Sequence, residues 1–389
     1  MNDLQKGTIA LIKSALTGEK NSLPENFVFA DAVALAKKHE IYTMLYYGAL
    51  NCDVSGNDIL MQDLFLITCQ TLALAERQKY FLNLIFNAFN EAHIKYMPLK
   101  GTLLKEMYPR SEMRIMGDAD ILIDVKQYDN ITSIMQKLGF KKGVESDHEF
   151  VWYNNGICIE LHRRLIPSYN KDYYKYYGEG WKLAKNCDGT RYSMTDEDQM
   201  IYLFTHFAKH YRSAGIGIRH IIDLWVFRNN KTLDEIYIKN ELEKLKLYEF
   251  YLNILNTLNL WFNGEEENEI TNFITNTIFN NGVYGRDETL TLSSAFITSK
   301  KVNGKVVRIV EFLKTVFLPL KNMQTKYPIL KKAPVLLPVM WFVRGFKAVL
   351  FKRKKIAEYS SSLKVITKES VEEFGDALKF VGLDFNFKE

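Results

Sequence analysis

The sequence has few of the features that mark secreted, membrane-spanning or zinc-binding proteins. It holds only four cysteines among 389 residues, and no two of them form a Cys-x-x-Cys pair. They are Cys52, Cys69, Cys158 and Cys187. This spacing is typical of reduced thiols in a cytoplasmic protein, and it argues against a disulfide framework or a zinc site. The N-terminus has an early acid and no long apolar run, so we expect no signal peptide.

Long hydrophobic runs are also scarce. The longest near the C-terminus, residues 333–343, contains Pro334 and Pro338. A membrane-spanning helix needs about 20 consecutive apolar residues, so this run is too short. We therefore expect a soluble, cytoplasmic protein with no transmembrane segment.

Charge is unevenly distributed along the chain. The net charge is +5, yet residues 300–355 hold fifteen Lys or Arg and one acid, Glu311, and so carry +14. The rest of the chain is therefore acidic, at −9. The basic excess is therefore concentrated in one C-terminal segment.

Hydrophobic periodicity divides the chain into helical flanks and one α/β segment. Apolar residues recur at helical spacing up to residue 90 and again from residue 196. We predict an N-terminal helical region at 1–90, an α/β core at 91–190, a helical domain completing the cleft at 191–300, and a basic helical C-terminal region at 301–389.

Turn residues and alternation locate the elements of the α/β core. The Asn155-Gly156 pair between two alternating stretches is a strong hairpin signal. The sequence predicts extended segments at 93–99, 118–125, 148–154 and 157–165, and helices at 102–108 and 127–139.

Two aspartates stand at the start of one of these strands, in the stretch GDADILID at 117–124. Side chains alternate along a strand, so Asp118 and Asp120 share one face, and the apolar residues between and after them share the other. Like charges at this spacing repel unless a positive group lies between them. The aspartate face must therefore meet water or a cation.

The segment ICIELHRRL repeats this alternation and adds a third acid. Its polar face carries Cys158, Glu160 and His162. If this strand lies beside the first, Glu160 joins the two aspartates in a hard-oxygen site suited to Mg²⁺ or Mn²⁺. The alternative is that the Asp-x-Asp pair binds nothing and that Glu160 faces solvent beside Arg163.

Several motifs together resemble a known family. The stretch PLKGTLLKEMYPRSEMRIMGDADILID, a later Glu-Leu-His, and a His-x-x-Lys-His helix followed by Asp-Leu are similar to nucleotidyltransferases of the DNA polymerase β-like superfamily. More narrowly, they resemble a poorly characterised bacterial branch of it. The resemblance extends over roughly residues 90–230.

The resemblance implies an α+β fold, with a small mixed-sheet core of the polymerase β-like type flanked by N-terminal and C-terminal helical regions. It implies transfer of a nucleoside monophosphate from an NTP, expected to be ATP, to an acceptor hydroxyl, with release of pyrophosphate. Asp118 and Asp120 would hold Mg²⁺ or Mn²⁺, and Glu160 would be the third carboxylate, nearest the attacking hydroxyl.

The same resemblance implies a nucleotide-binding set around the turn before the first helix of the core. Gly101 and Thr102 stand where the superfamily has Gly followed by Gly or Ser, and Gly117 precedes the aspartates. Lys100 and Arg114 flank the site and are candidate phosphate contacts. A second interpretation of Lys100 is that it neutralises the aspartates structurally.

Three polar residues outside this turn are candidate substrate contacts, because they lie in motifs that the resemblance includes. They are His162, His210 and Asp223. His206 and His210 lie four apart on a predicted helix, but Phe207 stands where a zinc protease has Glu, so we discount a zinc hydrolase. The pair either closes the cleft over substrate or makes a helix–helix contact.

The acceptor is not defined by sequence, and protein, RNA, sugar and small molecules stay open. Residues 327–355 mix aromatic and basic side chains. They would suit an anionic membrane surface, an acidic polymer, or a packed helix with a solvated basic end. The alternative to an enzyme is a non-catalytic adaptor that binds nucleotide or an anionic surface and retains the fold.

Overall fold

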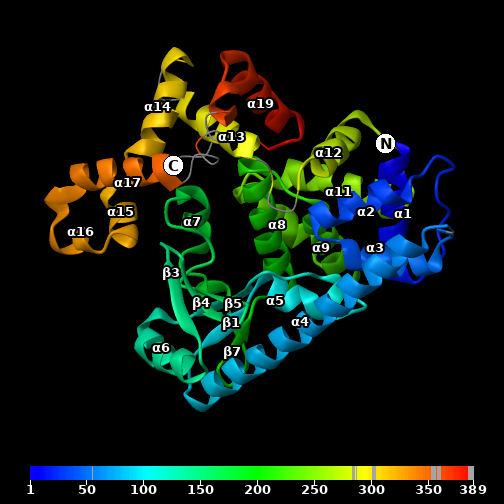
Figure 1. The fold of residues 1–389 in the computed structure, drawn as a ribbon. Helices are drawn as coiled ribbons and strands as arrows, with labels where there is room; N and C mark the ends of the chain where they lie inside the picture. The colour runs from blue at the N-terminus through cyan, green and yellow to red at the C-terminus, as the bar shows by residue number, and fades with distance from the viewer. Residues whose placement is uncertain are drawn as a thin grey trace. The chain divides into compact units, whose positions relative to one another are not determined.

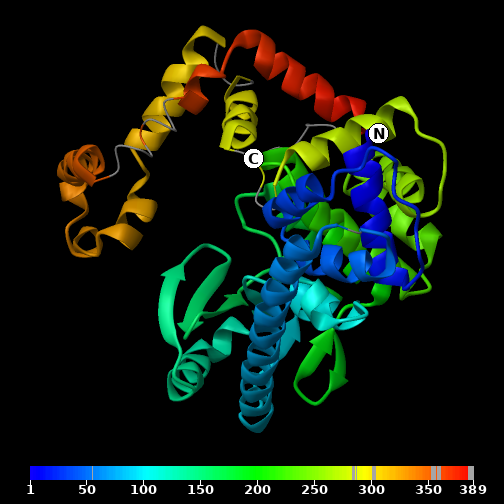
Figure 2. The same ribbon diagram turned by 45° about the vertical axis from the view of Figure 1, so that its right-hand side comes forward.

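The computed structural model describes residues 1–54, 56–282, 285, 287–299, 304–351, 356 and 361–383. They form two compact units, the larger made of residues 1–207 and 217–283 and the smaller of residues 208–216 and 284–385. Figure 1 and Figure 2 show the chain from two directions. The four-part division of the sequence stays a prediction.

A mixed seven-stranded sheet lies in the larger unit, in the order β3-β4-β5-β2-β1-β7-β6. The β2–β5 and β1–β7 pairs are parallel and the others antiparallel. The strands are β1 (Tyr96–Pro98), β2 (Ala119–Ile123), β3 (Lys141–Glu145), β4 (Glu149–Asn154), β5 (Ile157–His162), β6 (Lys185–Asp188) and β7 (Arg191–Ser193). The expected α+β class with a mixed sheet is confirmed.

The predicted hairpin joins β4 and β5. Asn154 pairs with Ile157, and the two residues between them have positive φ, 45° for Asn155 and 82° for Gly156. A two-residue hairpin turn of this type needs positive φ at both positions, which Asn and Gly adopt most readily. This turn sets the register of the strand that carries Glu160.

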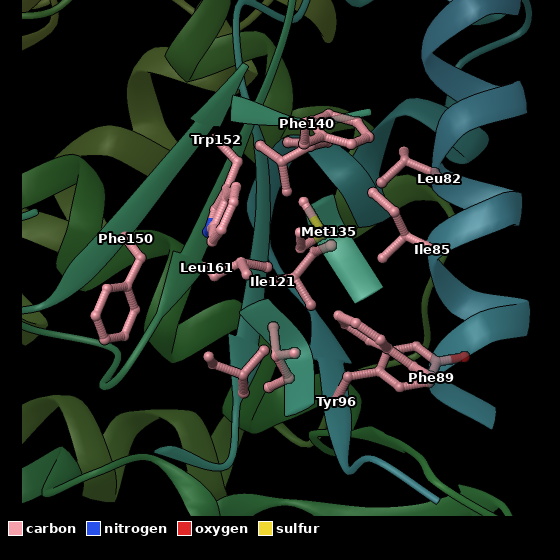
Figure 3. Packing of buried hydrophobic residues seen from close by; sticks show 14 of the residues in the cluster. Leu82, Ile85, Phe89, Tyr96, Ile121, Met135, Phe140, Phe150, Trp152 and Leu161 are labelled. Atoms are coloured by element: carbon pink, nitrogen blue, oxygen red, sulfur yellow. The ribbon is translucent and has the colours of Figure 1, made fainter. Parts of the chain in front are cut away.

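One face of the sheet is a hydrophobic core. It is covered by α4 (Asp58–Glu91), through residues such as Ile85 and Phe89, and by α6 (Tyr128–Lys137), through Met135 (Figure 3). The strand residues in this core alternate along each strand. They are Tyr96, Ala119, Ile121, Ile123, Phe150, Trp152, Ile157, Ile159 and Leu161. The other face carries the polar side chains of Asp120, Glu160 and His162, together with the buried Met97 and Leu122.

Further helices complete the larger unit. They are α1 (Asp3–Thr17), α2 (Phe29–His39), α3 (Tyr42–Asn51), α5 (Lys100–Leu104), α7 (Lys171–Tyr177), α9 (Ile218–Asn229), α10 (Glu235–Lys244), α11 (Tyr248–Phe262) and α12 (Glu269–Asn280), with α8 (Asp196–Ser213) running from this unit into the smaller one. His39 joins three of them, because its ring nitrogens contact the carbonyl of Phe279 (3.2 Å) and the N–H of Ile218 (3.1 Å).

The smaller unit is helical where it is described. Its helices are α13 (Asp287–Ser299), α14 (Gly304–Val316), α15 (Leu320–Lys326), α16 (Ile329–Lys332), α17 (Leu337–Phe351) and α19 (Lys368–Phe380). A small core forms between α13, α14 and the segment leading into α19. Its members are Ala295, Val307, Leu363, Ile366 and Val371.

Within the described part of the chain, two helical stretches are long and apolar enough to cross a membrane by length and composition alone. The first, α4, packs on the sheet, and the second is Pro334–Phe351. The run at 333–343 is by itself too short for a membrane span, but in the structure it belongs to this longer helical stretch. Pro334 begins a 3-10 turn and Pro338 lies in the first turn of α17, where a proline is tolerated, so the helix continues beyond 343.

Candidate active site

The three predicted carboxylates lie on the polar face of the sheet. Strands β2 and β5 are parallel neighbours in the register Asp120–Glu160, as the alternation predicted. Asp118 lies one residue before β2, on the same face, and its carboxyl shares a hydrogen bond with Glu160. The adjacency of the strands is confirmed, and the catalytic roles stay predictions.

Asp120 is the best anchored of the three. It is only 4% exposed, and its Oδ1 accepts hydrogen bonds from Lys100 Nζ (2.8 Å) and from His162 Nε2 (2.7 Å). Burial alone would raise its pKa, but the charge of Lys100 and the hydrogen bond from His162 outweigh burial and hold the pKa well below its usual range. Asp120 is therefore ionised at neutral pH.

Asp118 and Glu160 behave in the opposite way. Burial and then the charge of Asp118 raise the pKa of Glu160 to about 8. Burial and then the charge of Asp120 raise the pKa of Asp118. Two carboxyls this close cannot both ionise easily without a positive partner. A proton or a divalent cation between them relieves the repulsion.

Lys100 forms an ion pair with Asp120, as expected if it neutralises the aspartates structurally. Its ammonium lies against Asp120, and its pKa is raised above the usual range because the Asp120 carboxylate outweighs the effect of burial. The backbone supports this placement, since Lys100 has φ 44° and the N–H of Leu99 donates to the carbonyl of Asp120 (3.0 Å). A phosphate contact of Lys100 stays a prediction.

His162, a candidate substrate contact, is 1% exposed and holds Asp120. Its Nδ1 has no hydrogen-bond partner among the described residues. Next to it lie His148 and Glu149, a group that the sequence analysis missed. Burial would raise the pKa of Glu149, but the hydrogen bond from His148 lowers it to about 2. The hairpin register pairs Glu149 with His162, so counting back from the Asn-Gly turn would have found it.

Gly101 and Thr102 lie in the first turn of α5, directly after Lys100. A Cβ on Gly101 would lie 3.3 Å from Met116 Sδ and 3.4 Å from Arg114 Nη2, so close packing requires the glycine. The Thr102 N–H donates to the carbonyl of Leu99 (3.0 Å), and its hydroxyl is buried without a partner among the described residues. The place of these two residues in a nucleotide-binding turn stays a prediction.

Thr102 lines a cavity of about 380 Å³ on the α4 side of β1. Lys105 also lines it and donates to Gln78 Oε1 (2.9 Å). Burial and then the charge of Arg114 lower the pKa of Lys105 to about 8. Pro98, which pairs with Ile121, lies on this side of β1, so the cavity is behind the carboxylate face.

Arg114 and Asp223 bind each other. Arg114 Nε lies 2.8 Å and 3.1 Å from the two carboxylate oxygens of Asp223, which also accepts a hydrogen bond from the Tyr108 hydroxyl (2.6 Å). Both charged residues are buried, at 8% and 7% exposure. The pair fixes the segment before β2 to α9. Gly117, the remaining candidate in this segment, is exposed beside Asp118.

His210 belongs to the smaller unit, near the end of α8, where its carbonyl accepts the N–H of Gly215 (3.0 Å). Its predicted substrate contact stays a prediction.

The donor set fits a hard divalent cation. Asp120, Glu160 and His162 place one ligand atom each within 4.8 Å of one another, and Asp118 adjoins Glu160. Carboxylate oxygens are the ligands that Mg²⁺ and Mn²⁺ prefer. Burial and then the neighbouring carboxylates raise the pKa values of Asp118 and Glu160, and a bound cation would offset both effects.

Similar solved structures include the antibiotic-resistance factor ANT(2'')-Ia, at 12% identity over 49% of this chain and 99% of that one, with a TM-score of 0.33. The polyadenylate synthase of Megavirus is also similar, at 12% identity over 52% of this chain and 45% of that one, with a TM-score of 0.30. These scores carry no argument about function. No curated protein matches the chain.

A family model described as an uncharacterised nucleotidyltransferase matches residues 26–263, which is more than half of the chain and includes all three carboxylates. The chain therefore belongs to this family of nucleotidyltransferases.

Proposed function

We propose that the protein transfers a nucleoside monophosphate from an NTP, with ATP the first candidate, to a hydroxyl group of an acceptor, and releases pyrophosphate. The reaction would take place in the cytoplasm and depend on Mg²⁺ or Mn²⁺. The acceptor is a protein, an RNA, a sugar or a small molecule.

One observation carries the proposal. Asp120 and Glu160 lie directly opposite each other on the parallel strands β2 and β5, on the polar face of the sheet, and Asp118 adjoins Glu160. Divalent cations held there would neutralise phosphate charge and lower the pKa of a hydroxyl nucleophile.

The protein's own groups have separate tasks in this scheme. Lys100 and His162 hold the Asp120 carboxylate in one orientation and keep it ionised. Glu160, whose pKa is raised to about 8, is the carboxylate best suited to accept the proton of the attacking hydroxyl. Preorganised charge and positioning then supply most of the rate enhancement.

The proposal is tested by incubating the protein with each NTP and Mg²⁺ and measuring pyrophosphate release, with a cell extract as the source of acceptor. We expect Asp118→Asn and Asp120→Asn to abolish release. The matched control is Asp124→Asn, at the opposite end of the same strand, because Asp124 caps the N–H of Lys126, which Asn does equally well. Equal release by wild type and Asp120→Asn would contradict the proposal.

A second candidate is a non-catalytic nucleotide-binding adaptor. The observation that favours it is the ion pair between Lys100 and Asp120, in which an ammonium already neutralises a carboxylate expected to bind metal. Calorimetric titration with ATP and Mg²⁺ distinguishes the two. Binding with no pyrophosphate release by wild type or by Lys100→Gln would favour the adaptor.

A further inference from the structure

Helix α17 is attached to the rest of its unit through Trp341 and Arg344. The Trp341 Nε1 donates to the carbonyl of Leu318 (2.9 Å), and Arg344 Nη1 donates to the carbonyls of Thr315 (2.8 Å) and Val316 (3.1 Å). The ring of Trp341 also meets Phe317 edge to face at 5.1 Å. Residues 341 and 344 are three apart, so these contacts define one side of the helix.

The opposite side of α17 and the turn before it is an exposed apolar stripe. Its members follow one another at intervals of three or four residues and so share a face. They are Val335 (82% exposed), Val339 (54%), Phe342 (80%), Phe346 (68%) and Leu350 (47%). Among the described residues of α17, none is buried. A contiguous apolar surface of this kind marks an interaction site.

The surroundings of the stripe are basic. Lys347 is on the exposed part of the helix, and Lys331 and Lys332 are exposed on the preceding α16. In the sequence, residues 300–355 carry +14 with one acid, Glu311. That acid is 5% exposed and is bound to Lys314.

We propose that the α17 stripe lies flat in the headgroup region of a membrane that contains anionic phospholipids. Phenylalanines and aliphatic residues on one helical face, with lysines beside them, are the pattern of an interfacial helix. Each lysine near an anionic leaflet adds attraction of its own. The site of nucleotidyl transfer is on the other unit, and this proposal does not depend on it.

Three other occupants fit less well. A second copy of the chain would bring a basic surface against a basic surface. A nucleic acid would satisfy the lysines but leave the phenylalanine stripe in water. A transmembrane placement would put Arg344 and Lys347 in the hydrocarbon, and Arg344 would have to leave the carbonyls that it binds.

The experiment is co-sedimentation of the full chain with two kinds of vesicle, phosphatidylcholine alone and phosphatidylcholine mixed with phosphatidylserine. We expect the wild type to bind the mixed vesicles and to be released by alkaline carbonate. The double variant F342D/F346D is expected to lose at least about 100-fold in affinity, because two phenylalanines that would be buried in the membrane are replaced by charged groups. The double variant K331Q/K332Q is expected to lose about 10-fold or more, on mixed vesicles only.

The matched control is Ile236→Asp, a change at a residue that is 75% exposed on α10 of the larger unit. It is expected to bind like wild type. The proposal is overturned if F342D/F346D also binds like wild type, or if poly-U RNA displaces the wild type from vesicles. Retention in the pellet after carbonate would overturn the flat orientation in favour of a spanning helix. Circular dichroism confirms that each variant is folded, and the changed side chains are exposed.

Discussion

Alternate residues of β2 and β5 point to opposite faces of the same sheet. Burial stabilises the apolar side chains on one face and shifts the pKa values of the carboxyl groups on the other. On one face Ile121 and Leu161 are buried among apolar side chains from α4 and α6. On the other, Asp120 and Glu160 stand side by side, partly shielded from water. The comparison teaches that the apolar face stabilises the backbone that keeps the like charges together.

The largest expected effect is a loss of transfer rate when Glu160 is changed, with no such loss when Cys158 on the same face is changed. Replacing Glu160 by Gln keeps its size but removes the proton acceptor, so transfer should fall by about 10²- to 10⁴-fold. Cys158→Ser, two residues earlier on that face, should leave the rate near wild type. Single-turnover pyrophosphate release measures both, and equal losses in the two variants would mean that the face matters only as a whole.

The apolar face should respond in stability instead of chemistry. Trp152 is fully buried in the core, so Trp152→Ala should lower the free energy of unfolding by about 3–5 kcal/mol. Its neighbour Tyr153 is 48% exposed and points to the other face, and Tyr153→Ala should change stability by no more than about 0.5 kcal/mol. Urea unfolding measures both values. A similar cost at the two positions would break the distinction between the faces.

Metal addition should stabilise the folded protein through the carboxylate face. A ligand that binds only the folded state at 100 times its Kd raises the free energy of unfolding by about 2.7 kcal/mol. Mg²⁺ should therefore raise the melting temperature of wild type, and chelation by EDTA should reverse the rise. Asp118→Asn should show a much smaller rise. The idea fails if the variant and wild type respond equally.

His39 is a buried titratable group outside the carboxylate face, and it should make stability depend on pH. Burial lowers the pKa of His39 from 6.5 to about 4. The unfolded chain therefore binds the proton more readily, and stability is lost as pH falls from 6.5 toward 4. Between pH 7 and pH 5 the loss should be about 2 kcal/mol, which His39→Gln should reduce. Urea unfolding at the two pH values measures it, and an unchanged loss in the variant would assign it elsewhere.

Local patterns in the sequence predicted the centre of the fold. The alternation in 118–125 and 157–165 located β2 and β5, and the Asn155-Gly156 turn set the hairpin. Helix α6 ends just before Gly139, which has φ 82°, as the glycine predicted. In each case the signal lies within a few residues of the element it describes.

What could not be predicted depends on contacts between distant residues or on exposed strands. Strand β3 is exposed at every position and β6 likewise, so neither has an apolar alternation to detect. Arg114 and Asp223 pair across 109 residues, and Lys100 turns to Asp120 through an unusual backbone conformation. Sequence indicated that these side chains were candidates for the site, but not which of them would be partners.

The parallel pairing of β2 with β5 also has a consequence for synthesis on the ribosome. An antiparallel neighbour can form as soon as a short turn has been made, whereas parallel strands need a long crossover. Here the crossover includes α6 and the outer strands β3 and β4. Asp118 and Asp120 thus emerge well before Glu160 can reach them, and α9, which fixes Arg114, emerges later still. The nascent chain therefore carries an incomplete carboxylate site until most of the larger unit has been made.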